Sequence, residues 1–577
     1  MRQIFKSAII VSIFILSFTS CSNYLNTAPG NQYDDATVWQ NSTLVEEFVD
    51  NIYLGIPYPY QWYMNASLTD EAIPVQYDGV VGVVLTGTMT PDNKGAFDNN
   101  WANCMENYWW NSCYNNIREC NLFFEKINQT PFADQNRKSQ ITGEVHFLRA
   151  YFYYLLFIQY GGVPLIDKTY NIGDNYSIKR NTLAETVTFI VNDLDKADSL
   201  IGDQSDKTRA TKGSILALKS RVLLYAASDL FNSKANWAPG YAHPELVSYM
   251  DDNRQQRWQA AKDAAKAVMD LNQYSLYNDG SDPTTNFENL FLSMDNNEQI
   301  FIAKYDKINY PFYGTDWISS VCGTPSFGGF GLNQVTANLA DAFENADGTP
   351  FNWATQSADP YVHRDPRFYA TILYNGAPWV AMDWNSWSFV SHSVQTGTWA
   401  SGATGSDFKS GEFTGYYIRK FIDPSFFTYY YGPRQPQPYV QIRYAEILLN
   451  YAEACIALGE EDEARRVINL IRERAGMPDI TDSGTQLVAK YRNERRVELA
   501  WESQRFFDVR RWMIASQAYQ PALGVQVTYP TDGSTADPVY KEVQVENRAW
   551  TNSQYLIPIS RSEMQANPAL IQNPGYN

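Results

Sequence analysis

Residues that carry common catalytic and metal chemistry are scarce in this chain. Its 577 residues include only four histidines, His146, His243, His363 and His392. It contains no His-Glu-x-x-His, Cys-x-x-Cys, Gly-x-Ser-x-Gly or Gly-x-x-x-x-Gly-Lys motif, which argues against the metallopeptidase, hydrolase and nucleotide-binding classes that carry these motifs. His146 lies in a strongly apolar stretch and is expected to be a core histidine. A pair of carboxylates for glycoside hydrolysis stays open, because 63 acidic residues offer many candidates.

Long apolar runs are also lacking, apart from one at the N-terminus. Met1–Lys6 is basic, Ala8–Phe18 is apolar except for two serines, and small residues precede Cys21. This pattern predicts a secretory signal, since the run is shorter than the roughly 20 residues that span a bilayer. With a cysteine after the small residues, it resembles a bacterial lipoprotein signal, in which several acyl chains on Cys21 anchor the mature protein. The alternative is an ordinary cleaved signal with a chance cysteine.

Disulfides and excess positive charge are two further absences. If Cys21 is lipidated, five cysteines remain, an odd number that does not form a disulfide framework, so buried free thiols are expected. The net charge is −18, and it becomes −20 when residues 1–20 are removed with their two positive charges. An acidic chain repels nucleic acids and anionic lipid surfaces. Neither is therefore expected as a ligand.

Two acidic segments offer oxygen ligands for Ca²⁺. Asp251-Asp252 is one, and the other runs from Asn278 to Asp282. Neither fits an EF-hand loop, and turns or solvated faces are the preferred interpretation. No cofactor is expected, with Ca²⁺ as the one open possibility.

Helical periodicity dominates both ends of the mature chain, so a mainly α fold is expected. Paired helices with short connections are typical of stacked repeats such as TPR units, although the strict TPR consensus is not met. The pattern predicts helices over residues 109–127, 140–160, 182–200, 211–231, 258–271, 442–458, 460–475 and 485–512.

Residues 275–435 differ from the helical regions. Gly, Asn, Ser, Thr and aromatic residues replace the helical period, and six of the 16 tryptophans lie here. A long irregular stretch in a compact protein is usually functional, and the aromatic content argues against disorder. We interpret this stretch as an ordered excursion from the helical scaffold.

Short motifs recur in order along nearly the whole mature chain, at residues 143–165, 209–225, 365–368, 442–454, 471–478, 494–500, 555–559 and 572–576. Together they resemble the SusD/RagB family, surface lipoproteins of Bacteroidetes that capture nutrients, mostly glycans. One departure is Ser503-Gln504, where the family usually has glycine before Arg-Phe. We expect it to affect a local turn. The buried Arg149 needs a partner, for which Glu446, Glu453 and the run Arg495–Glu498 are candidates.

The resemblance implies a SusD-like fold with about four TPR-like hairpins and a binding face built from residues 60–110 and 275–435. It also implies that the protein is not catalytic. Such proteins sit as a lid on a SusC-like TonB-dependent barrel in the outer membrane and pass oligosaccharide inward. The predicted organisation is a signal peptide (1–20), a lipidated tether (21–40), a helical region (41–275), the excursion (276–435) and a C-terminal helical region (436–577).

Glycan binding needs flat aromatic platforms and a few polar groups for hydroxyls. The predicted platforms lie in irregular, polar surroundings, whereas Trp109 and Trp110 enter a helix and are assigned to the core. Asp70 is the predicted hydroxyl acceptor. The predicted platforms are Trp101, Trp317, Tyr313, Tyr310, Trp379, Trp384 and Trp387.

Two other functions stay open at this point. A lipid-anchored glycoside hydrolase would need an acid of raised pKa and a partner carboxylate. A TPR-type scaffold would bind peptides in its helical groove. Glycan turnover distinguishes the first, and the aromatic excursion argues against the second.

Overall fold

The computed structural model describes residues 35–57, 64–75, 81–97, 110–171, 173–305, 317–327, 329–383, 388–409, 413–425 and 436–576. Within these ranges no helix combines the length and the apolar character that a membrane crossing requires. The predicted signal peptide and Cys21 lie outside the described residues.

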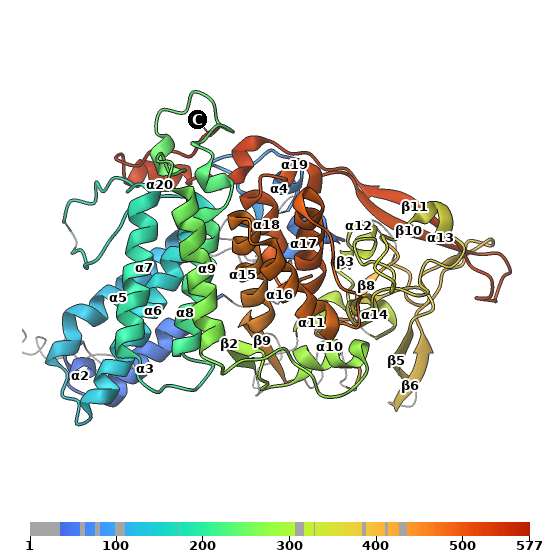
Figure 1. Ribbon diagram of the computed structural model, residues 1–577, viewed down its shortest axis with the longest axis horizontal. Coiled ribbons are helices and arrows are strands. Elements are labelled where there is room, and N and C mark those ends of the chain that lie inside the picture. The colour runs from blue at the N-terminus through green and yellow to red at the C-terminus, as the bar shows by residue number, and fades with distance from the viewer. Residues whose placement is uncertain are drawn as a thin grey trace, which may run out of the picture.

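In the part of the chain that the structure describes, eight long helices stack in order, each against the next, in the left and centre of Figure 1. They are enough for four helix pairs, and the mainly α fold is confirmed. Their bounds are α5 (Trp110–Lys126), α6 (Gln135–Tyr160), α7 (Leu183–Leu200), α8 (Lys212–Ala227), α9 (Arg254–Asp270), α15 (Tyr444–Leu458), α16 (Glu461–Arg474) and α17 (Gly484–Glu498).

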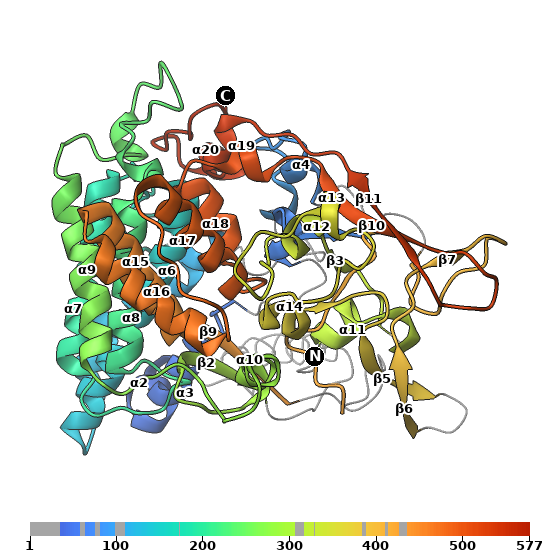
Figure 2. The same cartoon turned by 45° about the vertical axis from the view of Figure 1, so that its right-hand side comes forward.

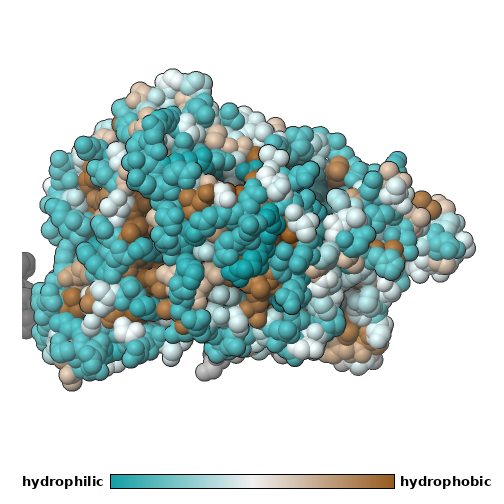
Figure 3. All heavy atoms as spheres, viewed as in Figure 1, coloured by the Kyte–Doolittle hydropathy of each residue, from teal (hydrophilic) through white to brown (hydrophobic). Residues whose placement is uncertain are grey.

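Local sequence signals explain where these helices begin and end. Thr182 caps α7 in a reciprocal capping box with Glu185. Gly459 ends α15 at a φ of +81°, a conformation that glycine adopts without strain. The last two turns of α6 are buried on every side, as the sequence predicts. On the face seen in Figure 3, hydrophilic side chains cover most of the helices, and apolar ones show only in separate patches.

One predicted helix is wrong. Residues 485–512 form two helices, α17 and α18 (Gln504–Arg511), instead of one. The break contains Trp501 and Ser503, whose φ values of +62° and +64° lie in the left-handed region and cannot continue a right-handed helix. Ser503 thus occupies a turn in which glycine would be unstrained. The local turn expected at Ser503-Gln504 is therefore present.

The excursion is inserted between α9 and α15, and a strand pair closes its base. β2 (Gln299–Tyr305) pairs antiparallel with β9 (Gln437–Arg443), which brings the two ends of the excursion together. Most buried apolar residues of the long helices belong to one large hydrophobic core, while most of a second core comes from the excursion, including Phe287, Phe343 and Phe368. The excursion is therefore a packed layer and not only an irregular loop.

Short elements build this layer, on the right of Figures 1 and 2. Its helices are α10 (Pro283–Leu292), α11 (Trp317–Cys322), α12 (Ala337–Ala340), α13 (Trp353–Gln356) and α14 (Pro366–Thr371). Its smaller sheets pair β4 (Ile372–Leu373) with β8 (Tyr417–Ile418), and β5 (Pro378–Asp383) with β6 (Ser388–Ser393).

The C-terminal region also contains a β-hairpin that the sequence prediction did not include. β10 (Ala522–Tyr529) pairs antiparallel with β11 (Val539–Glu546) and parallel with β7 (Thr398–Trp399) of the excursion. Figure 2 shows this hairpin reaching from the helices across the excursion. The remaining elements include α2 (Asp35–Trp39), α3 (Ser42–Tyr53), α4 (Gly82–Leu85), α19 (Ala515–Ala518) and α20 (Arg561–Ala566).

Two polar residues of α6 pair with an acid of α7. Arg149 pairs with Asp193 on the neighbouring helix α7, at 2.7 Å from Nε and 2.8 Å from Nη2. The predicted partners are wrong, because Glu446 instead binds Arg221 and Glu453 binds Arg511. His146 is a core histidine, as expected, and its Nδ1 lies 2.8 Å from Asp193. The described cysteines, Cys113, Cys120, Cys322 and Cys455, are buried free thiols, as expected.

Candidate functional site

The two segments predicted to build the binding face meet in the structure. β1 (Ala72–Pro74) pairs antiparallel with β3 (Asn333–Val335), so that a strand from residues 60–110 lies beside one from the excursion. The pairing continues where Val75 donates its N–H to the carbonyl of Leu332 at 2.8 Å. Segments about 260 residues apart in the sequence therefore form one surface element.

Buried polar contacts fix this junction. The side chain of Asn333 accepts hydrogen bonds from the Ser67 hydroxyl at 2.7 Å and from the Met64 backbone N–H at 3.3 Å. The amide of Asn333 also donates to Cys322 Sγ at the end of α11. Because all four residues are buried, these contacts hold the ends of the two segments in one position. Hereafter we call β1, β3 and α11 the junction.

Trp317 is a predicted platform of which the structure describes the backbone. It is the first residue of α11, which packs on β3. A hydrogen bond of 2.8 Å from Leu332 N–H, just before β3, to Val321 O adds to this contact. The side chain of Trp317 lies outside what the structure describes. Five other predicted platforms lie outside the described residues and stay predictions: Trp101, Tyr310, Tyr313, Trp384 and Trp387.

Trp379 packs in the core instead of forming a platform. Only 6% of its surface is exposed, and the Arg419 guanidinium lies 4.7 Å from the centre of its ring. Arg419 is itself held by Glu288 through two hydrogen bonds. A sugar cannot stack on a ring that is buried in the core, so the structure corrects this assignment.

Asp70 is likewise occupied within the protein. Its two carboxylate oxygens each accept a hydrogen bond of 2.8 Å from Arg505, and Arg496 lies at 2.9 Å. Burial acts to raise the pKa of Asp70, but Arg496 and Arg505 outweigh it and hold that pKa well below its usual range. The geometry makes Asp70 the partner of the Arg-Phe motif, with both of its oxygens engaged inside the protein.

The pKa of Glu71, next to Asp70, is shifted in the opposite direction. Burial, together with the negative charge of Asp70, raises the pKa of Glu71 to about 8. Its Oε1 accepts the backbone N–H of Trp501 at 3.3 Å, in the turn between α17 and α18. Two adjacent acids thus differ in protonation at neutral pH because only one of them has arginines on both oxygens.

A buried ion-pair network joins the excursion to the helices. Arg367 of the excursion binds Asp365, Glu494 and Glu498, with the shortest distance 2.5 Å to Glu494. Glu498 also pairs with Arg443 at 2.7 Å. The Asp-Pro-Arg-Phe and Glu-Arg-Arg-Val-Glu motifs of the sequence are therefore two sides of one contact, and their role is structural.

A serine, a histidine and an aspartate meet beside β6, but not as a catalytic triad. His392 Nε2 lies 2.7 Å from Asp407 and 3.5 Å from the Ser326 hydroxyl, which also binds Asp407 directly. A triad needs the serine and the orienting carboxylate on opposite imidazole nitrogens. Here both use Nε2. Asp407 also accepts Gln395 N–H at 2.9 Å, so the cluster fastens the end of the β5–β6 hairpin.

Both acidic segments considered for Ca²⁺ make local contacts. Asp251 accepts the Asn253 N–H and pairs with Arg257, and Asp252 pairs with Lys234. Asp282 caps α10 by accepting from the N–H groups of Thr284 and Thr285, and Asp279 accepts from Ser281 and Asn289. Among the described residues, no three or more His, Cys, Asp or Glu side chains gather as metal ligands would.

The model of the SusD family matches residues 274–576, more than half of the chain. The chain belongs to the SusD family. The predicted resemblance is confirmed. A second family model, described as "Starch-binding associating with outer membrane", matches residues 23–224. The family description thus associates such proteins with the outer membrane.

Relatives with this fold match nearly the whole chain. A crystal structure of a SusD-like protein from Bacteroides fragilis is 30% identical, with a TM-score of 0.77, and the match covers 95% of this chain and 100% of that one. SusD-like protein P38 of Formosa agariphila is 24% identical over 554 residues, which cover 90% of this chain and 92% of the relative. A structure named "Laminarin binding SusD-like protein" has a TM-score of 0.63 at 21% identity, covering 93% and 100% of the two chains.

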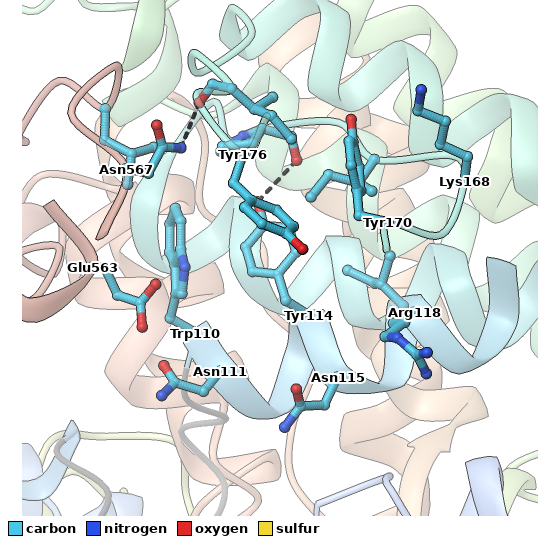
Figure 4. Close-up of a pocket in the computed structure, with 15 residues that line it drawn as sticks. Trp110, Asn111, Tyr114, Asn115, Arg118, Lys168, Tyr170, Tyr176, Glu563 and Asn567 are labelled. Carbon is cyan, nitrogen blue, oxygen red and sulfur yellow. Dashed lines mark hydrogen bonds between the residues drawn. The ribbon is translucent and has the colours of Figure 1, made fainter. Parts of the chain in front are cut away.

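The sequence prediction missed an aromatic pocket on the helical side. It is lined by α5, the segment after α6 and α20 (Figure 4). Trp110 lies in it, in the buried position that the sequence assigned. The available signal was Tyr170 and Tyr176, two tyrosines in a polar stretch without helical period, the same kind of surroundings that singled out Trp317.

Proposed function

We propose that this protein captures oligosaccharides at the cell surface without turning them over, and delivers them to a SusC-like TonB-dependent transporter. The observation that carries the proposal is the junction, where both predicted binding segments meet on one rigid support. Buried contacts of Asn333 fix its geometry before a ligand arrives. A preorganised support of this kind lowers the entropic cost of binding.

The family supports glycans as the ligand class. Starch binding is named in the description of one matching family model, and laminarin binding in the name of a relative with this fold. The predicted platforms Trp101 and Trp317 supply the flat apolar surfaces that the CH-rich faces of pyranose rings require. Which glycan is bound depends on how the platforms are set relative to one another.

Binding to the soluble form lacking residues 1–21 tests this proposal. A glycan array and affinity gels identify the glycan, and Trp101→Ala and Trp317→Ala are each expected to weaken its binding at least tenfold. Their thermal unfolding should match that of the parent. Trp353→Phe is the matched control, because Trp353 belongs to the excursion and its indole N–H is held by Asp341 at 2.9 Å. Normal binding by both alanine variants would remove these residues from the site.

The same material separates the alternative functions. Release of reducing ends from the bound glycan would make the protein a glycoside hydrolase and would contradict capture without turnover. Binding of peptides, with no glycan bound on the array or the gels, would support the TPR-type scaffold instead.

Lipid anchoring and the partnership with a transporter have to be tested in cells. We propose that Cys21 is lipidated, as its position after small residues suggests. Cys21→Ser should abolish incorporation of labelled palmitate and move the protein from the membrane to the soluble fraction, whereas retention of label would contradict lipidation. The partnership is tested by purifying the tagged protein from detergent-solubilised outer membranes, where a TonB-dependent barrel should be recovered with it. Purification of the tagged protein without such a barrel would contradict the partnership.

A further inference from the structure

The pocket on the helical side is built entirely outside the excursion. Its walls come from the first half of α5, from residues 164–178 that follow α6, and from residues 563–570 in and after α20 (Figure 4). Its volume is about 530 Å³. This size falls within the range of about 300–1,000 Å³ that is usual for small-molecule sites.

Four aromatic rings form its wall. The ring centres of Trp110 and Tyr114 are 5.0 Å apart, and those of Tyr170 and Tyr176 are 5.8 Å apart. The hydroxyl of Tyr114 donates to the carbonyl of Pro164 at 2.8 Å, which fixes that ring. Tyr176 is 47% exposed. The wall thus offers ring surface that the protein itself does not cover.

Amides and a carboxylate surround these rings. Asn111 and Asn115 are exposed one turn apart on α5, and neither side chain has a hydrogen-bond partner in the part of the chain that the structure describes. Across the pocket, Asn567 donates to the carbonyl of Ile178 at 2.7 Å, which steadies that wall. Glu563 is half-buried and faces Trp110 in Figure 4. Hydroxyl groups of a ligand would find both donors and acceptors here.

The charges around the pocket favour a ligand without strong charge. Arg118 is paired with Glu119 at 2.8 Å, and Lys168 lies 5.1 Å from the ring centre of Tyr170. Glu563 opposes them on the far side (Figure 4). An uncharged ligand with one apolar face and a polar rim matches this combination of rings and amides better than a phosphate or an acidic peptide does.

We propose that this pocket is a second saccharide-binding site, which holds one or two pyranose units on Tyr170 and Tyr176 with hydroxyls on Asn111, Asn115 and Glu563. Only the ligand class rests on the proposed function, since no lining residue belongs to the junction. Two separate sites on one anchored protein raise the effective concentration of a long glycan, because release from one leaves it held at the other.

The test uses the whole mature protein with laminarihexaose, maltohexaose and xylohexaose, each measured by isothermal titration. At least one of them should show a second site that Tyr176→Ala, or Asn111→Ala with Asn115→Ala, weakens about tenfold. Trp317→Ala should leave this second site unchanged. Asn192→Ala is the matched control, because Asn192 is an exposed asparagine on α7 outside the pocket.

The possible outcomes separate this proposal from the proposed function. If a hexasaccharide binds and Trp317→Ala removes all binding while the pocket variants do nothing, the second site is wrong and the proposed function stands. If the pocket variants lose binding and Trp317→Ala does not, the second site stands and the junction platform is wrong. If none of the three hexasaccharides binds at a site that the pocket variants change, the proposal is overturned.

Discussion

At the scale of single residues, Ser503 holds a conformation that suits glycine better. Its φ of +64° costs an L-residue about 1 kcal/mol or more. Glycine removes this strain, but part of the gain is offset because glycine also increases the conformational entropy of the unfolded chain. We therefore expect Ser503→Gly to raise the free energy of unfolding by about 0.5–1 kcal/mol. Urea denaturation measures it. Ser199→Gly, within helix α7, is the control and should lower stability by a similar amount. A loss of stability in Ser503→Gly would contradict this account of the turn.

Asp70 allows the structural and the ligand-binding interpretations to be separated. Asp70→Asn leaves the guanidinium groups of Arg505 and Arg496 buried without their counter-charge. Removing one partner from such a buried pair typically costs about 3–5 kcal/mol, so the variant should unfold at clearly lower urea concentration. Glycan affinity of the folded variant should not change. An undiminished stability together with lost affinity would restore Asp70 as a hydroxyl acceptor.

At the scale of elements, the excursion depends on the ion pairs at its base. Arg367→Met leaves Asp365, Glu494 and Glu498 buried together without their shared cation. We expect a loss of about 3–5 kcal/mol in unfolding free energy, and faster proteolytic cleavage within residues 276–435 than within the helices.

The control for that experiment is an exposed ion pair. Arg466→Met removes the contact of Arg466 with Glu463, where 55% of the arginine side chain is exposed. Such a pair contributes at most about 1 kcal/mol, so both stability and cleavage should stay close to the parent. Equal effects of the two substitutions would contradict a special role for the buried network.

Elements differ in how far the sequence predicts them. Helices such as α7 and α15 carry their own signals, a capping box at Thr182 and a terminal Gly459, and these act within a few residues. The pairing of β1 with β3 has no local signal, because it depends on contacts about 260 residues apart. The β10–β11 hairpin did have a local sequence signal, because buried and exposed residues alternate along Val525–Tyr529. The left-handed turn at Ser503 broke a helix whose charge pattern continues through it.

The same reasoning applies to the candidate sites. The sequence identified aromatic residues in polar surroundings, but burial decides their role, and burial is a property of the folded chain. Trp379 and Asp70 are occupied by Arg419, Arg496 and Arg505, which come from distant segments. For the same reason the partner of Arg149 was missed, since Asp193 was one of many acids until α7 packed beside α6.

At the scale of the whole molecule, buried acids predict a stability maximum in mildly acidic solution. Burial acts to raise the pKa of Glu453, but the charge of Arg511 outweighs burial and lowers that pKa to about 2. The pKa of Glu494 is lowered in the same way by Arg367. The folded chain keeps these groups charged where the unfolded chain has protonated them. Their contribution is complete above about pH 4.5 and is lost as the pH falls through the lowered values.

Glu71 and Asp341 act in the opposite direction above that pH. Burial raises their pKa to about 8 and about 7, so the folded chain retains two protons that the unfolded chain releases near pH 4. Stability should therefore decline as the pH rises from about 5 to 8, by about 1.4 kcal/mol for each pH unit over which one such proton is retained. Urea denaturation at a series of pH values measures this decline, which Glu71→Gln should flatten. Glu473→Gln, at an exposed acid, should leave the profile unchanged. A parent profile that stays level from pH 5 to 8 would contradict the buried protons.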